Sequence, residues 1–226
     1  MSWGEVYKIN SNMKKPLNEQ LRDFEFQPVR IITTTGTYKP EKNGTYRVIC
    51  VGAGGNGASY ANGTNNRAAS GGGGGVAIKT LKLLKSSTYN VTIGTTASFS
   101  YDSNSLTATA GSNADAGGGS AIAGKGGTAS GGDYNYPGTS GSTSEADRAI
   151  IQPGSVGVYI GCLSQIKTAW AVVNGNAAEL RYGDSILGYG GSGNGFSDGP
   201  ASSSYGKAET AGLPAAVIII PLEMEE

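Results

Sequence analysis

Apolar and polar residues alternate along much of the chain with the period of two that is typical of β-strands. The segments "VRIITTTGTYKP" and "NGTYRVICVG" are rich in β-branched and aromatic residues, and Pro40 and Asn43-Gly44 lie between them. Proline followed by Asn-Gly between two apolar runs is typical of a strand–turn–strand unit. The pattern therefore predicts one strand over Val29–Tyr38 and a second over Tyr46–Val51.

Further strands follow from the same pattern. The segment Val76–Leu84 alternates, but its apolar residues stay on one face only if a bulge shifts the phase within it. Tyr89–Ile93 alternates without interruption, weaker strand signals recur between about residues 155 and 183, and the last strand is expected over Ala216–Ile220. The residues expected to share a face are Val76, Ile78, Leu81 and Leu83 in the first segment, and Tyr89, Val91 and Ile93 in the second.

Helical spacing of apolar residues occurs only near the N-terminus. Residues 1–28 are polar and mixed in charge, and Pro16 suits the first position of a short helix with one apolar edge. Such a helix does not fold alone, so we expect residues 1–28 to be an attachment segment. Residues 29–226 are expected to form an all-β sandwich or jelly-roll-like domain with long ordered glycine-rich loops.

Two glycine-rich stretches, 111–132 and 188–212, interrupt strands that have to pair with one another. Gly/Ser-rich chain is commonly flexible linker, and that alternative stays open. Tyrosines recur through the glycine-rich parts, however, and the final strand lies beyond all of them. We therefore expect these stretches to be ordered, with glycine allowing backbones to pack closely as polyglycine-type helices or stacked loops.

Composition narrows the classes of function. Glycine makes up 38 of 226 residues, the formal net charge is zero, and the chain has no histidine. A neutral surface gives no electrostatic footprint for nucleic acid. The absence of histidine removes the commonest general base and the commonest metal ligand. We expect no enzyme activity, no cofactor, no metal and no nucleic-acid partner; no run reaches 18 apolar residues, so no membrane insertion is expected either.

The two cysteines and the N-terminus bear on the cellular compartment. Cys50 and Cys162 both lie in apolar segments, and they are expected to be buried, unpaired thiols. The opening residues lack the apolar region of a signal peptide. The protein is therefore expected to be made in a cytoplasm.

One glycine motif has the spacing of a nucleotide site. Gly52–Gly57 reads GAGGNG and satisfies G-x-G-x-x-G. A dinucleotide site also needs a helix that begins at the motif and an acidic residue about 20 positions on. The following residues have no helical spacing, and Gly71–Gly75 stands where the carboxylate should be. The motif therefore predicts a strand that runs into a glycine loop, without a bound phosphate.

Carboxylates are the remaining candidates for catalysis. Aspartates are scattered at irregular spacing, and two of them could meet in the fold as a glycosidase pair. The sequence shows no such pairing, and solvated loop residues are the expected assignment. These aspartates are Asp102, Asp115, Asp133, Asp147, Asp184 and Asp198.

Three segments in order resemble the glycine-rich domain of phage and prophage tail-fibre tip proteins. They read "ITTTGTYKPEKNGTYRVICVGAGGNG", "SGGGGGVAIKTLKLLKSSTYNVTIG" and "GLPAAVIII". The resemblance covers about residues 29–226, and "WGEVYKINSNMKKPLN" is similar to the openings of small prophage tail proteins. The stretch Ile150–Gly183 departs from the family because it is longer and more apolar than the usual glycine loops.

The resemblance implies an adhesin that binds a bacterial surface glycan or protein through tyrosine-bearing loops. It also implies synthesis in a bacterial cytoplasm, assembly into the virion tail, and contact with other tail proteins through residues 1–28. Two alternatives stay open, a purely structural tail or baseplate component and a capsule-degrading enzyme; an oligomer of identical chains also stays open. The candidate receptor-binding residues are Tyr134, Tyr136, Tyr189, Phe196 and Tyr205.

Overall fold

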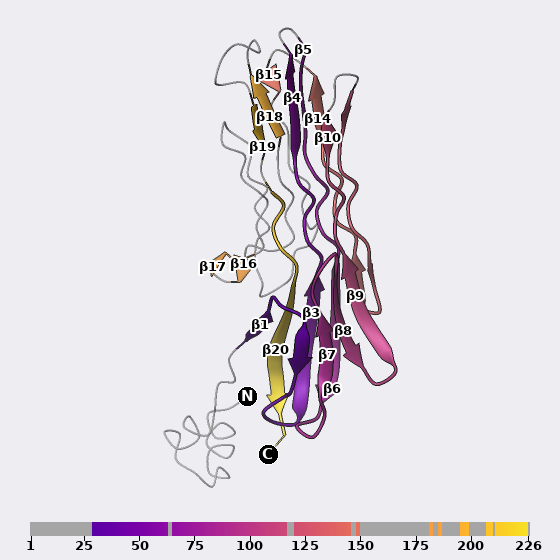
Figure 1. Cartoon of the computed structure of the whole chain (residues 1–226). Coiled ribbons are helices and arrows are strands. Elements are labelled where there is room, and N and C mark those ends of the chain that lie inside the picture. The colour runs from indigo at the N-terminus through magenta and orange to yellow at the C-terminus, as the bar shows by residue number, and fades with distance from the viewer. Residues whose placement is uncertain are drawn as a thin grey trace, which may run out of the picture.

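The structure is a computed structural model of the 226-residue chain. It describes residues 29–62, 65–116, 120–145, 148–149, 181–182, 185–186, 195–198, 207–209 and 211–225. All regular structure in these residues is β, which confirms the predicted fold class. The molecule is elongated, with a sandwich at one end, wavy glycine-containing segments in the middle and short hairpins at the far end (Figure 1). No helix in the described residues is long and apolar enough to cross a membrane.

The sandwich consists of two five-stranded antiparallel sheets. The first sheet contains, in spatial order, β1 (Arg30–Ile32), β20 (Ala216–Met224), β3 (Gly44–Val51), β6 (Val76–Leu83) and β13 (Tyr134–Tyr136). The second sheet contains β12 (Ala129–Ser130), β9 (Asn104–Thr109), β8 (Thr96–Tyr101), β7 (Tyr89–Thr92) and β2 (Gly36–Tyr38). The last strand of the chain, β20, is thus an interior strand between β1 and β3.

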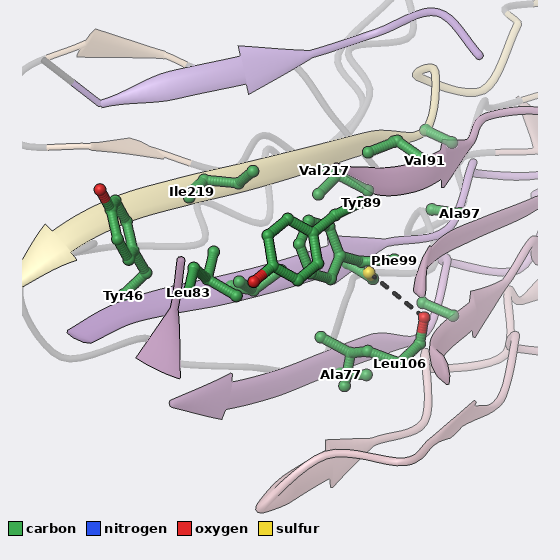
Figure 2. Packing of buried hydrophobic residues seen from close by; sticks show 14 residues of the cluster. Tyr46, Ala77, Leu83, Tyr89, Val91, Ala97, Phe99, Leu106, Val217 and Ile219 are labelled. Carbon is green, nitrogen blue, oxygen red and sulfur yellow. Dashed lines mark hydrogen bonds between the residues drawn. The ribbon is translucent and has the colours of Figure 1, made fainter. Parts of the chain in front are cut away.

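The main core lies between the two sheets. Tyr89 and Phe99 stack there with ring centroids 5.5 Å apart, and Figure 2 shows them beside Leu83 and Val217. The predicted shared face of β7 is confirmed, because Tyr89 and Val91 are in this core and Ile93 packs against it. The buried residues of the main core are Tyr46, Val48, Cys50, Ala77, Leu83, Tyr89, Val91, Ala97, Phe99, Leu106, Ala108, Ala215, Val217 and Ile219.

The first sheet is also buried on its other face, which we call the second face. Val29 and Tyr136 pack against it. This burial corrects the bulge predicted for Val76–Leu84, because the β3–β6 register runs without a shift. Consecutive apolar residues occur in β6 because both faces of this strand are buried. A bulge that shifts the alternation from one face to the other is not needed. The buried residues of the second face are Ile49, Val51, Val76, Ile78, Ile218 and Ile220.

The single strand predicted over Val29–Tyr38 is wrong. The chain bends between β1 and β2, and the two halves pair in different sheets. Thr35 holds the bend, because its hydroxyl accepts a hydrogen bond from the Ile93 amide (2.9 Å) and donates one to the Ile93 carbonyl (3.1 Å). A threonine in a β-branched run therefore marks a crossing point between the sheets.

The hairpin formed by β8 and β9 was not among the predicted strands. Its inward residues are Ala97, Phe99, Leu106 and Ala108, and they alternate with serine and threonine. Because serine and threonine make this hairpin weakly hydrophobic, its sequence resembles that of the glycine-rich loops around it. Asp102, at the turn, adopts a φ of 49°, a conformation that Asn and Asp tolerate better than most residues.

Short strands form the far end of the molecule and one outlying pair. One three-stranded sheet has the order β14 (Thr143–Glu145), β5 (Asn65–Ala69), β4 (Ala58–Asn62), and another has the order β15 (Arg148–Ala149), β18 (Gly195–Asp198), β19 (Lys207–Glu209). Two-stranded pairs are β10 (Asp115–Ala116) with β11 (Ala121–Ile122), and β16 (Arg181–Tyr182) with β17 (Ser185–Ile186).

Candidate functional site

Glycine-containing segments connect the sandwich to the far-end strands and bond to one another through their backbones. We call this set the glycine bundle. Its segments span residues 52–57, 70–75, 109–114, 124–128, 138–142 and 211–214. The sequence predicted ordered glycine stretches. In the described part of 111–132, residues 111–114 and 124–128 belong to the bundle, and short strands are formed by 115–116, 121–122 and 129–130. Most of 188–212 lies outside the described residues.

The central segment, 70–75, contacts four others with a three-residue repeat. Residues 70 and 73 donate to carbonyls of 138–142 and accept from amides of 124–128. Residues 72 and 75 donate to carbonyls of 109–114 and accept from amides of 52–57, at 2.8 to 3.0 Å. Three residues per turn is the period of the polyproline II helix, which has no internal hydrogen bonds. The backbone amides and carbonyls of segment 70–75 are therefore free to bond to neighbouring segments on several sides. Four neighbouring segments form hydrogen bonds with them.

Glycine is required because the backbones approach so closely. A Cβ atom on Gly72 would lie 1.9 Å from the Lys125 carbonyl oxygen, and one on Gly74 would lie 1.9 Å from that of Gly52. Collagen places glycine at every third residue for the same steric reason. The signal was present in the sequence as Gly-x-x-Gly spacing. It occurs at Gly52/Gly55, Gly72/Gly75, Gly124/Gly127 and Gly138/Gly141.

The nucleotide-like motif is part of this bundle. The amides of Gly52 and Gly55 donate to the carbonyls of Gly75 (2.9 Å) and Gly72 (2.8 Å). A pyrophosphate would need free amides at a helix N-terminus, but the chain continues into β4. The sequence context argued against a dinucleotide site, and the hydrogen bonds of Gly52 and Gly55 agree with that interpretation.

The bundle leads directly into the strands of the far end. Segment 52–57 continues into β4, β5 returns into 70–75, 109–114 continues into β10, and β11 leads into 124–128. Strands β18 and β19 lie against this group, in contact with β4. Hairpin ends from separate parts of the chain therefore gather at one end, opposite the end of the sandwich where β20 finishes (Figure 1). Loops held in this way on a rigid scaffold are common sites of recognition.

The candidate aromatic residues do not form one site. Tyr134 and Tyr136 lie on β13, because that strand pairs with β6 at the edge of the first sheet. Phe196 lies on β18, at the far end of the bundle, opposite Ala208. Tyr189 and Tyr205 lie outside the described residues. The strand pairing thus separates two tyrosines on the sandwich from the phenylalanine at the far end.

The edge of the first sheet around β13 has a defined polar and aromatic arrangement. The Asp133 carboxylate accepts hydrogen bonds from the Thr80 amide (3.0 Å) and the Lys79 ammonium (2.9 Å), and these lower the pKa of Asp133. Lys79 also lies 5.9 Å above the ring of Tyr101. Tyr134 and Tyr136 stack with ring centroids 6.4 Å apart. These tyrosines pair with Ile78 and Val76 and lie on the second face, whereas Asp133 pairs with Lys79 on the main-core face. We call these edge residues, Asp133, Tyr134 and Tyr136, the flank site.

A groove of about 390 Å³ lies on the sandwich where β1 crosses to β2. Arg30 pairs with Glu41 at 2.6 Å across it, and both side chains are exposed. Burial, with the neighbouring Tyr46, raises the pKa of Tyr38 to about 12. All the lining residues come from one continuous segment, 30–41, so the groove is formed where this segment passes from one sheet to the other. It is separate from the far-end hairpins and from the flank site.

The described residues offer little for acid–base or metal chemistry. No group of three or more His, Cys, Asp or Glu residues comes together among them. Cys50 is a buried free thiol whose Sγ lies 3.5 Å from the Leu106 carbonyl oxygen (dashed line in Figure 2), and burial raises its pKa. Its predicted burial is confirmed, while Cys162 lies outside the described residues.

The scattered aspartates have separate positions. Asp133 pairs with Lys79, and Asp102 occupies the β8–β9 turn. Asp115 and Asp198 lie on β10 and β18, in different small sheets. Asp147 and Asp184 lie outside the described residues.

Comparison with known proteins identifies the family. A family model described as a glycine-rich domain matches residues 33–217. A comparison with curated proteins found no match. Because the family match covers most of the chain, the chain belongs to the glycine-rich domain family.

Proposed function

We propose that this member of the glycine-rich domain family is an adhesin of the phage or prophage tail-fibre type. It binds a bacterial surface receptor, a glycan or a protein, through the hairpins at the far end of the glycine bundle. The observation that carries the proposal is the gathering of separate hairpins at one end by the bundle (Figure 1). In this account residues 1–28 attach the protein to other tail proteins, and the assembled protein is exposed on the virion.

The bundle provides two properties that a recognition surface needs. A six-residue polyproline II segment spans roughly 19 Å, so the hairpins are carried well away from the sandwich. Backbone hydrogen bonds to several neighbouring segments also fix the position at which each segment ends. Glycine loses more conformational freedom on folding than any other residue, and this loss is incurred during folding rather than on binding. Hairpins that are ordered in advance bind with a smaller entropic penalty.

Two exposed aliphatic residues at opposite ends of the molecule allow a matched test. Ile122 on β11 is 57% exposed at the far end, and Leu222 on β20 is 44% exposed on the sandwich. In Ile122→Lys and Leu222→Lys an exposed aliphatic side chain is replaced by the same charged one. Substitutions at such positions change the free energy of unfolding by about 0.5 kcal/mol or less, so both variants should fold.

The experiment measures binding of labelled protein to a panel of bacterial cells. We expect Ile122→Lys to weaken binding at least about tenfold, because it places a desolvated charge in the contact surface, while Leu222→Lys binds as the parent protein does. A parent protein that binds no cell of the panel would instead support a purely structural tail component. Binding by Ile122→Lys that equals binding by the parent would overturn the assignment of the receptor site to the far-end hairpins.

A further inference from the structure

Side chains link the segments of the glycine bundle at the level where the far-end strands β4 and β10 begin (Figure 1). Asn56 lies two residues before β4, and Asn113 lies two residues before β10. The Asn56 amide donates to Asn113 Oδ1 (2.9 Å), and the Asn56 carbonyl accepts from the Ala114 amide (2.8 Å). The two segments are thus bonded in both directions just before they become strands. We call Asn56 and Asn113 the junction pair.

The side chain of Asn56 also bonds to a third segment. Its Oδ1 accepts a hydrogen bond from the Gly212 amide at 2.9 Å. Gly212 is the third residue after β19, and a Cβ atom there would lie 2.1 Å from the Gly54 carbonyl oxygen, so the two backbones are in close contact up to this level. Asn56 therefore connects three points, namely the start of β4, the start of β10 and the exit from β19.

A serine makes the corresponding link between β5 and β14. Ser70 directly follows β5, and Ser142 directly precedes β14. Ser70 Oγ accepts from the Ser142 amide (2.8 Å), and the Ser70 amide donates to the Ser142 carbonyl (2.9 Å). Ser70 is fully buried, whereas Asn56 and Asn113 are exposed. Substitution of the junction pair therefore removes a link without leaving a buried polar group unsatisfied.

The junction pair acts where sheet pairing does not. Strands β4, β10 and β19 belong to three different small sheets, so ladder hydrogen bonds do not set their positions relative to one another. β10 has two residues and β19 has three. Strand pairs this small are marginally stable by themselves. Hydrogen bonds from Asn56 to the segments beside these strands therefore have a large share in holding them in place.

We propose that Asn56 is a positioning residue for receptor recognition, which acts with Asn113 by fixing β4, β10 and β19 relative to one another. The inference rests on the proposed function and assigns the arrangement of the far-end surface to two side chains at its base. A surface whose parts are fixed before binding loses less entropy when it binds. Removal of one such hydrogen bond should weaken receptor binding by roughly threefold to tenfold.

Substitutions can remove or keep each acceptor oxygen. Asn56→Ala removes the acceptor for the Gly212 amide, and Asn113→Ala removes the acceptor for the Asn56 amide. Asn56→Asp and Asn113→Asp keep an acceptor oxygen and should bind within about twofold of the parent. Asn43→Ala is the matched control, because exposed Asn43 accepts from the Lys85 amide (2.8 Å) at the opposite end of the molecule. Each alanine variant should melt within about 4 °C of the parent.

Two measurements test the role of the junction pair. Hydrogen exchange of the free protein, followed by NMR, should become faster in Asn56→Ala at the Gly212 amide and along β4, with β7 and β8 unchanged. The dissociation constant for cells that the parent recognises should rise by roughly threefold to tenfold in the same variant. Asn43→Ala should change neither quantity.

The contrary results separate this inference from the proposed function. Parent-like exchange or parent-like cell binding in Asn56→Ala would overturn the positioning role alone. Equally weak binding by Asn56→Ala and Asn56→Asp, with parent-like exchange in Asn56→Asp, would mean that the asparagine contacts the receptor itself, and would also overturn it. A parent protein that binds no cell would overturn the proposed function, and the positioning role with it.

Discussion

The α-carbon of Gly72 faces the carbonyl oxygen of Lys125 so closely that a Cβ atom would lie 1.9 Å from it. Gly72 belongs to the central segment of the glycine bundle, and its own amide donates to the Ser112 carbonyl at 3.0 Å. A side chain here cannot be accommodated by rotating a neighbouring side chain, because the clash is with backbone. Either the central segment or the segment that contains Lys125 has to move.

Substitution of Gly72 by alanine should therefore destabilise the whole bundle. We expect a loss of about 3 kcal/mol or more, which corresponds to a fall in melting temperature of roughly 6–12 °C for a chain of this length. Gly94→Ala is the matched control, because a Cβ there meets nothing within 4 Å and the backbone is outside the left-handed region. It should be neutral or stabilise by up to about 1 kcal/mol. Equal melting temperatures for the two variants would contradict the bundle.

Order in the stretch 111–132 has a direct protease test. Lys125 is an exposed potential trypsin site, but its amide donates to Ser112 Oγ (2.7 Å) and its carbonyl accepts from the Ser112 amide (2.9 Å). We expect the Lys125–Gly126 bond to resist trypsin in the native protein, because cleavage needs local unfolding of the backbone. Gly72→Ala should make the same bond susceptible. Cutting of the parent at the rate of an unfolded peptide would show that the stretch is linker.

The alternation of apolar and polar residues predicted many of the strands of the sandwich. Tyr46–Val51 and Ala216–Ile220 correspond to β3 and β20, since long β-branched runs specify strands by themselves. The β8–β9 hairpin was missed because serine and threonine dilute its hydrophobic signal. The split of Val29–Tyr38 depends on a hydrogen bond between Thr35 and Ile93, which are distant in sequence. Such a contact has no signature in local alternation.

The candidate site was less predictable for two physical reasons. The Gly-x-x-Gly repeat indicates closely packed segments, but backbone hydrogen bonds carry no side-chain code for which segments pair. The position of Tyr134 and Tyr136 depends on the register of a three-residue strand, Tyr134 opposite Ile78. Strands this short specify register weakly from their own sequence. The aromatic residues could therefore be named in advance, but their separation into two surfaces could not.

Cys50 should be unreactive in the native protein. Burial raises its pKa, and the thiolate is the form that reacts. In a Cys162→Ser variant, in which Cys50 is the remaining thiol, we expect labelling by a maleimide to be slow at pH 7 and not to accelerate at pH 9. Addition of urea should release fast labelling. An acceleration between pH 7 and pH 9 like that of an exposed thiol would contradict the position of Cys50 in the main core.

Alkaline pH should destabilise the protein partly through Tyr38. Burial raises the Tyr38 pKa from 10.0 to about 12, so between these values the folded state keeps a proton that the unfolded state releases. The resulting contribution to stability is complete below pH 10 and is lost as the pH rises toward 12. Urea melts at pH 9 and pH 11 should show a smaller loss of stability for Tyr38→Phe than for the parent. An equal loss would mean that Tyr38 is freely solvated.

In the proposed function the glycine bundle presents the far-end hairpins to a receptor. Hydrogen–deuterium exchange of the protein, free and bound to cells that it recognises, tests this arrangement. We predict protection on binding at β4, β5, β10 and β11, with unchanged exchange in β7 and β8 of the sandwich. Protection confined to the sandwich, with the hairpins exchanging as in the free protein, would contradict a receptor site at the far end.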